Sequence, residues 1–161
     1  MRYTFLALIL LMAFIGCDRK SAKIETYWSN ALELREADKL GEAISQLKMI
    51  ARDFPESAEA PEAIHKVGEI FLNDVKDYEI AIEEFQTVID NYPDSEMAAK
   101  ALFMIGYVYA NYLEAYSDAA DRYQSFIDQY PDHELVPSVQ FELDDMKDIL
   151  SEIDQLNAMA N

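Results

Sequence analysis

The stretch "VIDNYPDS" at residues 88–95 returns almost unchanged as "FIDQYPDH" at residues 126–133. A looser copy, "IARDFPES", occupies residues 50–57. Each copy contains one proline, and the three prolines, Pro55, Pro93 and Pro131, are evenly spaced. An even period of this size, which we call the repeat period, is typical of proteins in which each repeat is one small structural unit stacked on the next.

Each repeat is predicted to be a pair of helices. The segment before each proline has apolar residues at intervals of three and four, as in "AISQLKMI" (43–50), "AIEEFQTVI" (81–89) and "AADRYQSFI" (119–127). This spacing is typical of an amphipathic helix, which the following proline ends. A second helical pattern comes earlier in the unit, where "APEAIHKVGEIFLN" (60–73) aligns with "AAKALFMIGYVYAN" (98–111).

Two glycines, Gly68 and Gly106, lie in the middle of these predicted helices and are again one repeat period apart. Because glycine in a helix interior costs about 1 kcal/mol relative to alanine, each one indicates a close approach of a neighbouring helix. We expect the small residues Ala81 and Ala119 of the second helices to face them.

The order of these residues resembles a tetratricopeptide repeat. The packing positions that carry the resemblance are Gly68, Phe71, Ala81, Phe85 and Pro93, then Gly106, Tyr109, Ala119, Tyr123 and Pro131. A weaker first unit has Ala31, Leu34, Ala43, Leu47 and Pro55. The resemblance implies an all-α, tetratricopeptide-type α-solenoid of three helix hairpins, whose repeats of about 38 residues each fill positions 24–133.

A further amphipathic helix is predicted in residues 134–161, after the last repeat. A solenoid needs a terminal helix with a polar outer face, so this segment fits the role of a cap. Its length also leaves a tail that could contact a partner, and the sequence leaves both roles open.

The segment 1–16 has the layout of a secretory signal, with the cation Arg2 followed by the apolar run "FLALILLMAFIG". The only cysteine, Cys17, follows Gly16, and "FIGC" resembles a bacterial lipobox. The resemblance implies lipidation of Cys17, a short linker over 17–23, and a lipid-anchored protein of the bacterial envelope that faces the periplasm. The outer membrane is the expected location. Asp18 resembles an inner-membrane retention signal of some bacterial groups, so the choice of membrane stays open.

The composition argues against several classes of function. Acidic residues outnumber basic ones by 31 to 13, and such a surface repels nucleic acid. The two histidines, His65 and His133, are far apart in the sequence, and with only four glycines the chain offers neither a catalytic constellation nor a phosphate-binding loop. His65 and Glu69 have a spacing that metal sites use, but two ligands alone do not make a site. We therefore expect no enzymatic activity, no cofactor and no metal.

Recognition of another protein is the remaining class. In tetratricopeptide arrays the first helix of each unit lines a concave groove, which implies a partner-binding site formed by Trp28, Leu32, His65, Glu69, Asn73, Phe103, Tyr107 and Asn111. We expect the aromatic rings to be exposed there. The rings could instead belong to the core, and the two asparagines could simply end their helices.

The "YPDS" endings and the early repeats resemble the outer-membrane barrel-assembly lipoprotein (BamD-like) family. That resemblance implies a scaffold in outer-membrane protein assembly. The alternative is a periplasmic accessory protein for cell-wall, division or polysaccharide machinery. The expected partner is an envelope protein or peptide, and the sequence identifies neither that partner nor the oligomeric state.

Overall fold

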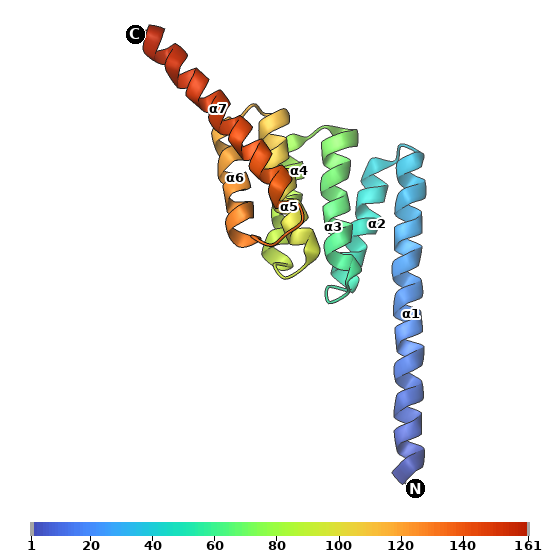
Figure 1. The fold of residues 1–161 in the computed structure, drawn as a ribbon. Helices are drawn as coiled ribbons and strands as arrows, with labels where there is room; N and C mark the ends of the chain where they lie inside the picture. The colour runs from blue at the N-terminus through green and yellow to red at the C-terminus, as the bar shows by residue number, and fades with distance from the viewer. Residues whose placement is uncertain (1, 161) are drawn as a thin grey trace. The chain divides into compact units, whose positions relative to one another are not determined.

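The computed structural model describes the backbone of residues 2–160 and the side chains of residues 19–160. Seven α-helices and one π-helical turn make up this part of the chain (Figure 1). The predicted signal and the side chain of Cys17 lie outside the described side chains. No helix among the described residues has the length and apolarity required to cross a bilayer.

The chain divides into two units, Met1–Ala63 and Ile64–Asn161. In the first unit, α1 (Arg2–Glu36) packs against α2 (Leu40–Asp53) as a helix hairpin (Figure 1). Helix α1 runs without interruption through the predicted linker at 17–23. The buried residues of α2 are Ala43, Leu47 and Ile50, the apolar positions expected from the sequence.

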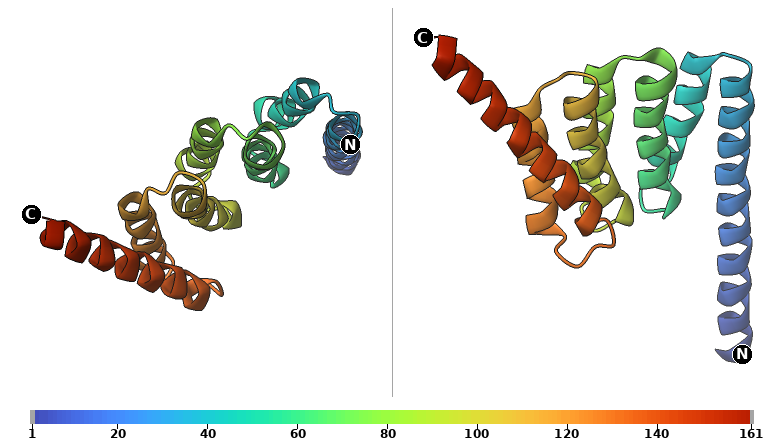
Figure 2. Two further views of the ribbon diagram at one scale, coloured as in Figure 1. Left: turned by 90° about the horizontal axis from the view of Figure 1, so that it is seen from above. Right: turned by 45° about the horizontal axis from the view of Figure 1, so that its top comes forward.

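The second unit begins within α3 (Glu59–Ile70), which ends in the π-helical turn η1 (Phe71–Val75). It continues with α4 (Tyr78–Asn91), α5 (Glu96–Asn111), α6 (Tyr116–Gln129) and α7 (Val136–Ala160). Neighbouring helices of the α4, α5, α6 and α7 series pack against one another (Figure 2). The fold is therefore all-α and built from tetratricopeptide-type helix hairpins, as the sequence predicts.

The core of each hairpin follows the repeat period. Helix α4 buries Ala81, Phe85 and Val88, and α6 buries Ala119, Tyr123 and Phe126 at the same positions. These helices end at Asn91 and Gln129, and in each case one tyrosine, Tyr92 or Tyr130, separates the helix from the proline. The start of α5 is set by Ser95, whose Oγ accepts a hydrogen bond from the backbone N–H of Ala98 at 3.3 Å.

The mid-helix glycines are explained by aromatic rings. A Cβ atom at Gly68 would lie 2.7 Å from Cε1 of Phe85, and one at Gly106 would lie 2.6 Å from Cε1 of Tyr123. The close approach predicted from the sequence is therefore present. The nearest atoms belong to the aromatic rings four residues after Ala81 and Ala119, which the sequence analysis did not single out as the partners of the glycines. Ala81 and Ala119 are fully buried nearby.

The turns inside the hairpins also repeat, although their sequences do not. Within the described part of the chain, positive φ is found at Asp38, Lys76 and Glu114, with values of 58°, 62° and 52°. Each lies just after the first helix of its hairpin and reverses the chain. This conformation is costly for residues other than glycine, so each position stores some backbone strain.

The first hairpin is one residue shorter before this turn. The N–H of Lys39 donates a hydrogen bond to the carbonyl of Leu34, which lies five residues earlier in the chain. In the second hairpin the N–H of Asp77 donates to the carbonyl of Phe71, which lies six residues earlier. Ala115 and Tyr109 repeat the longer arrangement. Equivalent positions of α1 and α3 are therefore separated in the sequence by one residue fewer than the repeat period.

This shift aligns the first helices of the three hairpins. Trp28 of α1 corresponds to His65 of α3 and, one full repeat period later, to Phe103 of α5. The three rings thus occupy one structural position in three different surroundings.

A hydrophobic core cluster of the second unit joins α5, α6 and α7. Val139, Leu143 and Met146 of α7 are buried against Tyr123 and Phe126 of α6. From Ser151 to Ala160 every residue of α7 is exposed, and Figure 2 shows this end extending beyond the other helices of the unit. Helix α7 thus covers the last hairpin, as expected of a terminal helix, and leaves a free end.

Candidate protein-binding surface

A groove in the first unit is built on one face of α1. Ile24, Trp28 and Leu32 recur at intervals of four residues, which places them in a row along the helix. Ile24 is buried, Trp28 is half-buried and Leu32 is 45% exposed. The row therefore passes from the core to the surface, and the indole ring lies at the boundary.

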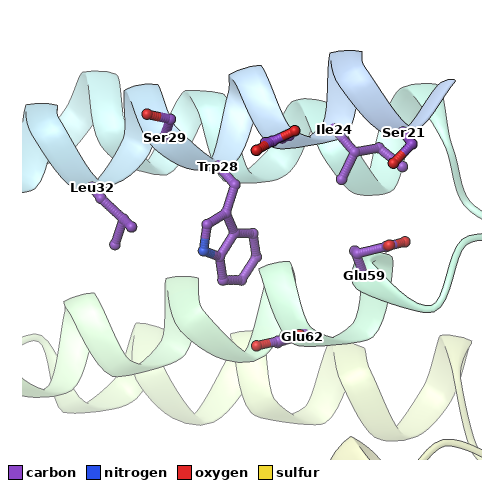
Figure 3. A pocket seen from close by; sticks show the side chains of 8 residues that line it. Ser21, Ile24, Trp28, Ser29, Leu32, Glu59 and Glu62 are labelled. Atoms are coloured by element: carbon purple, nitrogen blue, oxygen red, sulfur yellow. The ribbon is translucent and has the colours of Figure 1, made fainter. Parts of the chain in front are cut away.

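The opposite wall of the groove comes from the first turn of α3. Glu59 and Glu62 line a cavity of about 470 Å³ together with the α1 residues (Figure 3). Figure 3 shows the Trp28 side chain pointing from α1 toward this turn. The cavity is open to solvent and has room for more than one side chain.

The rim of the groove is acidic. Glu25, Glu59 and Glu62 are exposed, and none of them forms an ion pair within the described part of the chain. The residues described around this cavity include no basic side chain, although Lys20 lines an adjoining hollow of about 380 Å³. The groove thus combines an apolar floor with uncompensated negative charge.

His65 and Glu69 of the predicted site form a different kind of cluster in α3. His65 is only 8% exposed, and its ring centroid lies 5.0 Å from that of Phe85. Its Nδ1 lies 3.5 Å from Oε1 of Glu69, which also pairs with Lys66. The hydrogen bond with His65, and then the contacts with Lys66, lower the pKa of Glu69 to about 2. This cluster is mainly structural.

Among the described residues, no further metal ligands accompany His65 and Glu69. The described residues contain no group of three or more His, Cys, Asp or Glu side chains able to hold a metal ion. His65 Nε2 is buried without a hydrogen-bond partner among the described residues. Its ring is better described as a core side chain held by Phe85 and Glu69.

Phe103 and Tyr107 were expected to form an exposed aromatic patch with Trp28, and like Trp28 neither ring is fully exposed. Both are half-buried. Phe103 packs against the core cluster that α7 completes, and its ring centroid lies 6.0 Å from that of Tyr123. The pKa of Tyr107 is raised by burial, by Tyr112 and by Glu142 of α7. Phe103 is therefore packed against a core cluster that includes residues of α7, and Tyr107 lies near enough to Glu142 of α7 to feel its charge.

Asn73 and Asn111 are exposed, as expected. The side-chain amide of Asn111 donates a hydrogen bond to the carbonyl of Tyr107 in its own helix, at 3.0 Å. This contact satisfies a carbonyl near the end of α5. It agrees with the simpler interpretation, in which the asparagine helps to end the helix.

The sequence analysis missed the second wall of the groove. Glu59 and Glu62 follow Pro55 at the start of the next helix, and they meet Trp28 only when α1 and the first turn of α3 lie side by side. It also missed Tyr78 and Tyr112, whose ring centroids lie 4.7 Å apart where α4 begins and α5 ends. Both sets depend on contacts between different helices, which the spacing within one helix does not reveal.

A comparison with protein families finds tetratricopeptide repeats at residues 62–95 and 100–133. These segments are the second and third of the three repeats expected from the sequence. No curated protein matches the chain. Tetratricopeptide repeats are generally interaction scaffolds that bind protein partners, and the two matched segments suggest a role of this kind.

Proposed function

We propose that this protein is a lipid-anchored scaffold of the bacterial envelope, which binds a segment of a partner protein on the first helices of its repeats. The observation that carries the proposal is the groove at Trp28, where an aromatic ring lines an open cavity in a chain that contains tetratricopeptide repeats. Aromatic residues are favoured at protein interfaces because they bury a large area in a rigid ring.

The anchor is inferred from the sequence around Cys17. The lipobox-like "FIGC" would place lipid chains on Cys17, about two helical turns before Ile24 of the groove. The groove would then lie close to the membrane surface. The acidic chain, with a formal charge of −18, has little attraction to anionic headgroups, so attachment would depend on the lipid.

Outer-membrane protein assembly is the process that the resemblance to the BamD-like family supports. In that family a lipoprotein carries its repeats directly after the lipidated cysteine, and in this chain the predicted repeats begin soon after Cys17. Those proteins usually have about five repeats, whereas the sequence predicts three in this chain, of which two match the family model. That difference favours the second candidate, an accessory protein for cell-wall, division or polysaccharide machinery.

The test combines location and binding in the native cells. Cys17→Ser should move the protein out of the membrane fraction, and labelling with a fatty-acid analogue should be lost. Trp28→Ala should lose a protein that co-purifies with the wild type from membrane extracts. Phe141→Ala is the matched control, because Phe141 is 67% exposed on α7 and does not line this groove. Equal co-purification by the wild type, Trp28→Ala and Phe141→Ala would refute binding at Trp28.

A further inference from the structure

We infer that the Trp28 groove receives an arginine side chain of the bound segment, together with an apolar neighbour of that arginine. The inference rests on the proposed function and adds the chemistry of the partner. It starts from the three uncompensated carboxylates around one half-buried indole ring.

The floor of the groove suits the long stem of such a side chain. Ile24 and Leu32 lie one helical turn to either side of Trp28, so the indole ring continues into aliphatic surface in both directions. Arginine buries its methylene groups along apolar surface while its charged head stays hydrated. The cavity of about 470 Å³ exceeds the volume of one side chain, which leaves room for an adjacent apolar residue.

The charge of the groove selects a cation. Glu25 lies on α1 three residues before Trp28, and Glu59 and Glu62 line the same cavity from α3. A guanidinium over the indole ring gains a cation–π interaction and can pair with a carboxylate through two parallel hydrogen bonds. An acidic or neutral side chain gains neither. Lysine lacks the planar, forked geometry and should bind less well.

At the equivalent positions of the other repeats, the rings pack against neighbouring side chains of the core. His65 occupies the corresponding place in α3 and is buried against Phe85. Phe103 occupies it in α5 and packs against the cluster completed by α7. Trp28 is therefore the member of this series that lies on an open groove with acidic residues around it, which gives the first repeat a recognition role of its own.

Trp28 is the only tryptophan in the chain, so its fluorescence reports on this groove alone. The experiment titrates the purified full chain, in a mild detergent, with the capped tripeptide Leu-Arg-Leu. Matched peptides carry citrulline, lysine or glutamate in place of arginine. Citrulline keeps the shape of arginine and removes its charge, so it isolates the electrostatic contribution.

We expect a saturable fluorescence change with the arginine peptide, and roughly tenfold weaker binding with citrulline. Glu59→Gln combined with Glu62→Gln should weaken arginine binding by a similar factor, and added salt should weaken it in the wild type. Glu152→Gln is the control, since Glu152 is exposed on the free end of α7. Circular dichroism checks that each variant keeps its helices.

Equal affinity for arginine and citrulline would overturn the inference, as would unchanged binding by the double glutamine variant. Either result would leave the proposed function intact if Trp28→Ala still loses its co-purifying protein. Conversely, arginine binding without any Trp28-dependent protein partner would support the chemistry of the groove and refute the scaffold function. The two proposals therefore fail separately.

Discussion

Replacing Gly68 by alanine should destabilise the second hairpin, although alanine is normally the better helix residue. The new Cβ atom would lie 2.7, 2.8 and 3.0 Å from three ring atoms of Phe85. Carbon atoms in comfortable contact are about 3.5–4.0 Å apart, so the ring or the helix must move by about 1 Å. Phe85 has no exposed surface, and its ring cannot swing into solvent.

The size of the effect follows from two opposing contributions. Overpacking a close-fitting core costs about 1–3 kcal/mol, and a rigid buried ring places this site in the upper part of that range. The gain in helix propensity offsets about 1 kcal/mol. We therefore expect a net loss of about 1–2 kcal/mol for Gly68→Ala. Gly106→Ala should behave alike, because its Cβ atom would lie 2.6 Å from the Tyr123 ring.

Gly41 provides the matched control. It lies in α2, and a Cβ atom there would meet nothing within 4 Å. Gly41→Ala should leave the free energy of unfolding unchanged or raise it by up to about 1 kcal/mol. Urea denaturation of the full chain, followed by circular dichroism, measures all three variants.

A double-mutant cycle then identifies the partner. Phe85→Leu removes the ring atoms that crowd the new methyl group, so Gly68→Ala should cost less in that background than in the wild type. The coupling energy should be about 1 kcal/mol. The packing argument would be refuted if Gly68→Ala were as stable as the wild type, or if its cost were the same with and without the ring.

Three further predictions concern the second unit. Lys76→Gly and Glu114→Gly should each raise the free energy of unfolding by up to about 1 kcal/mol, because both residues have positive φ. A lower free energy of unfolding in urea denaturation would contradict this prediction. Tyr123→Phe should not destabilise the protein, since the hydroxyl of Tyr123 is buried without a hydrogen-bond partner among the described residues. A decrease of more than about 1 kcal/mol in the free energy of unfolding would show that the hydroxyl has such a partner. The carboxylate of Glu69 has its pKa lowered to about 2, so its contribution to stability is present above its ordinary value of 4.5 and is lost as the pH falls toward 2. The melting temperatures of the wild type and Glu69→Gln should therefore converge in strong acid, and a difference that is constant with pH would exclude this linkage.

The helices were predictable because the sequence repeats its own boundaries. The evenly spaced prolines mark the ends of α2, α4 and α6, and the apolar intervals give their buried faces. The positive-φ turns at Asp38, Lys76 and Glu114 were not predictable. None of them is the glycine that this left-handed conformation favours, so their residue types do not mark the turns.

The site was predictable only in part, because a groove has two walls. Trp28 and Leu32 follow from the helical spacing of one segment, whereas Glu59 and Glu62 reach the same cavity through the packing of another helix. Phe103 shows the opposite case. Its spacing places it on the expected face, but the ring also packs against a core cluster to which α6 and α7 contribute residues. Spacing within one helix carries no information about a covering helix from elsewhere in the chain.

The most direct test of the account is site-specific crosslinking at Leu32 in the native cells. Leu32 lines the groove and is 45% exposed, so a photoreactive phenylalanine derivative there should contact any bound segment. We predict a covalent adduct with a discrete partner protein at position 32, lost when Trp28→Ala is added, and no such adduct at position 141 on α7. An adduct that persists without Trp28, or that forms equally at both positions, would contradict recognition in this groove.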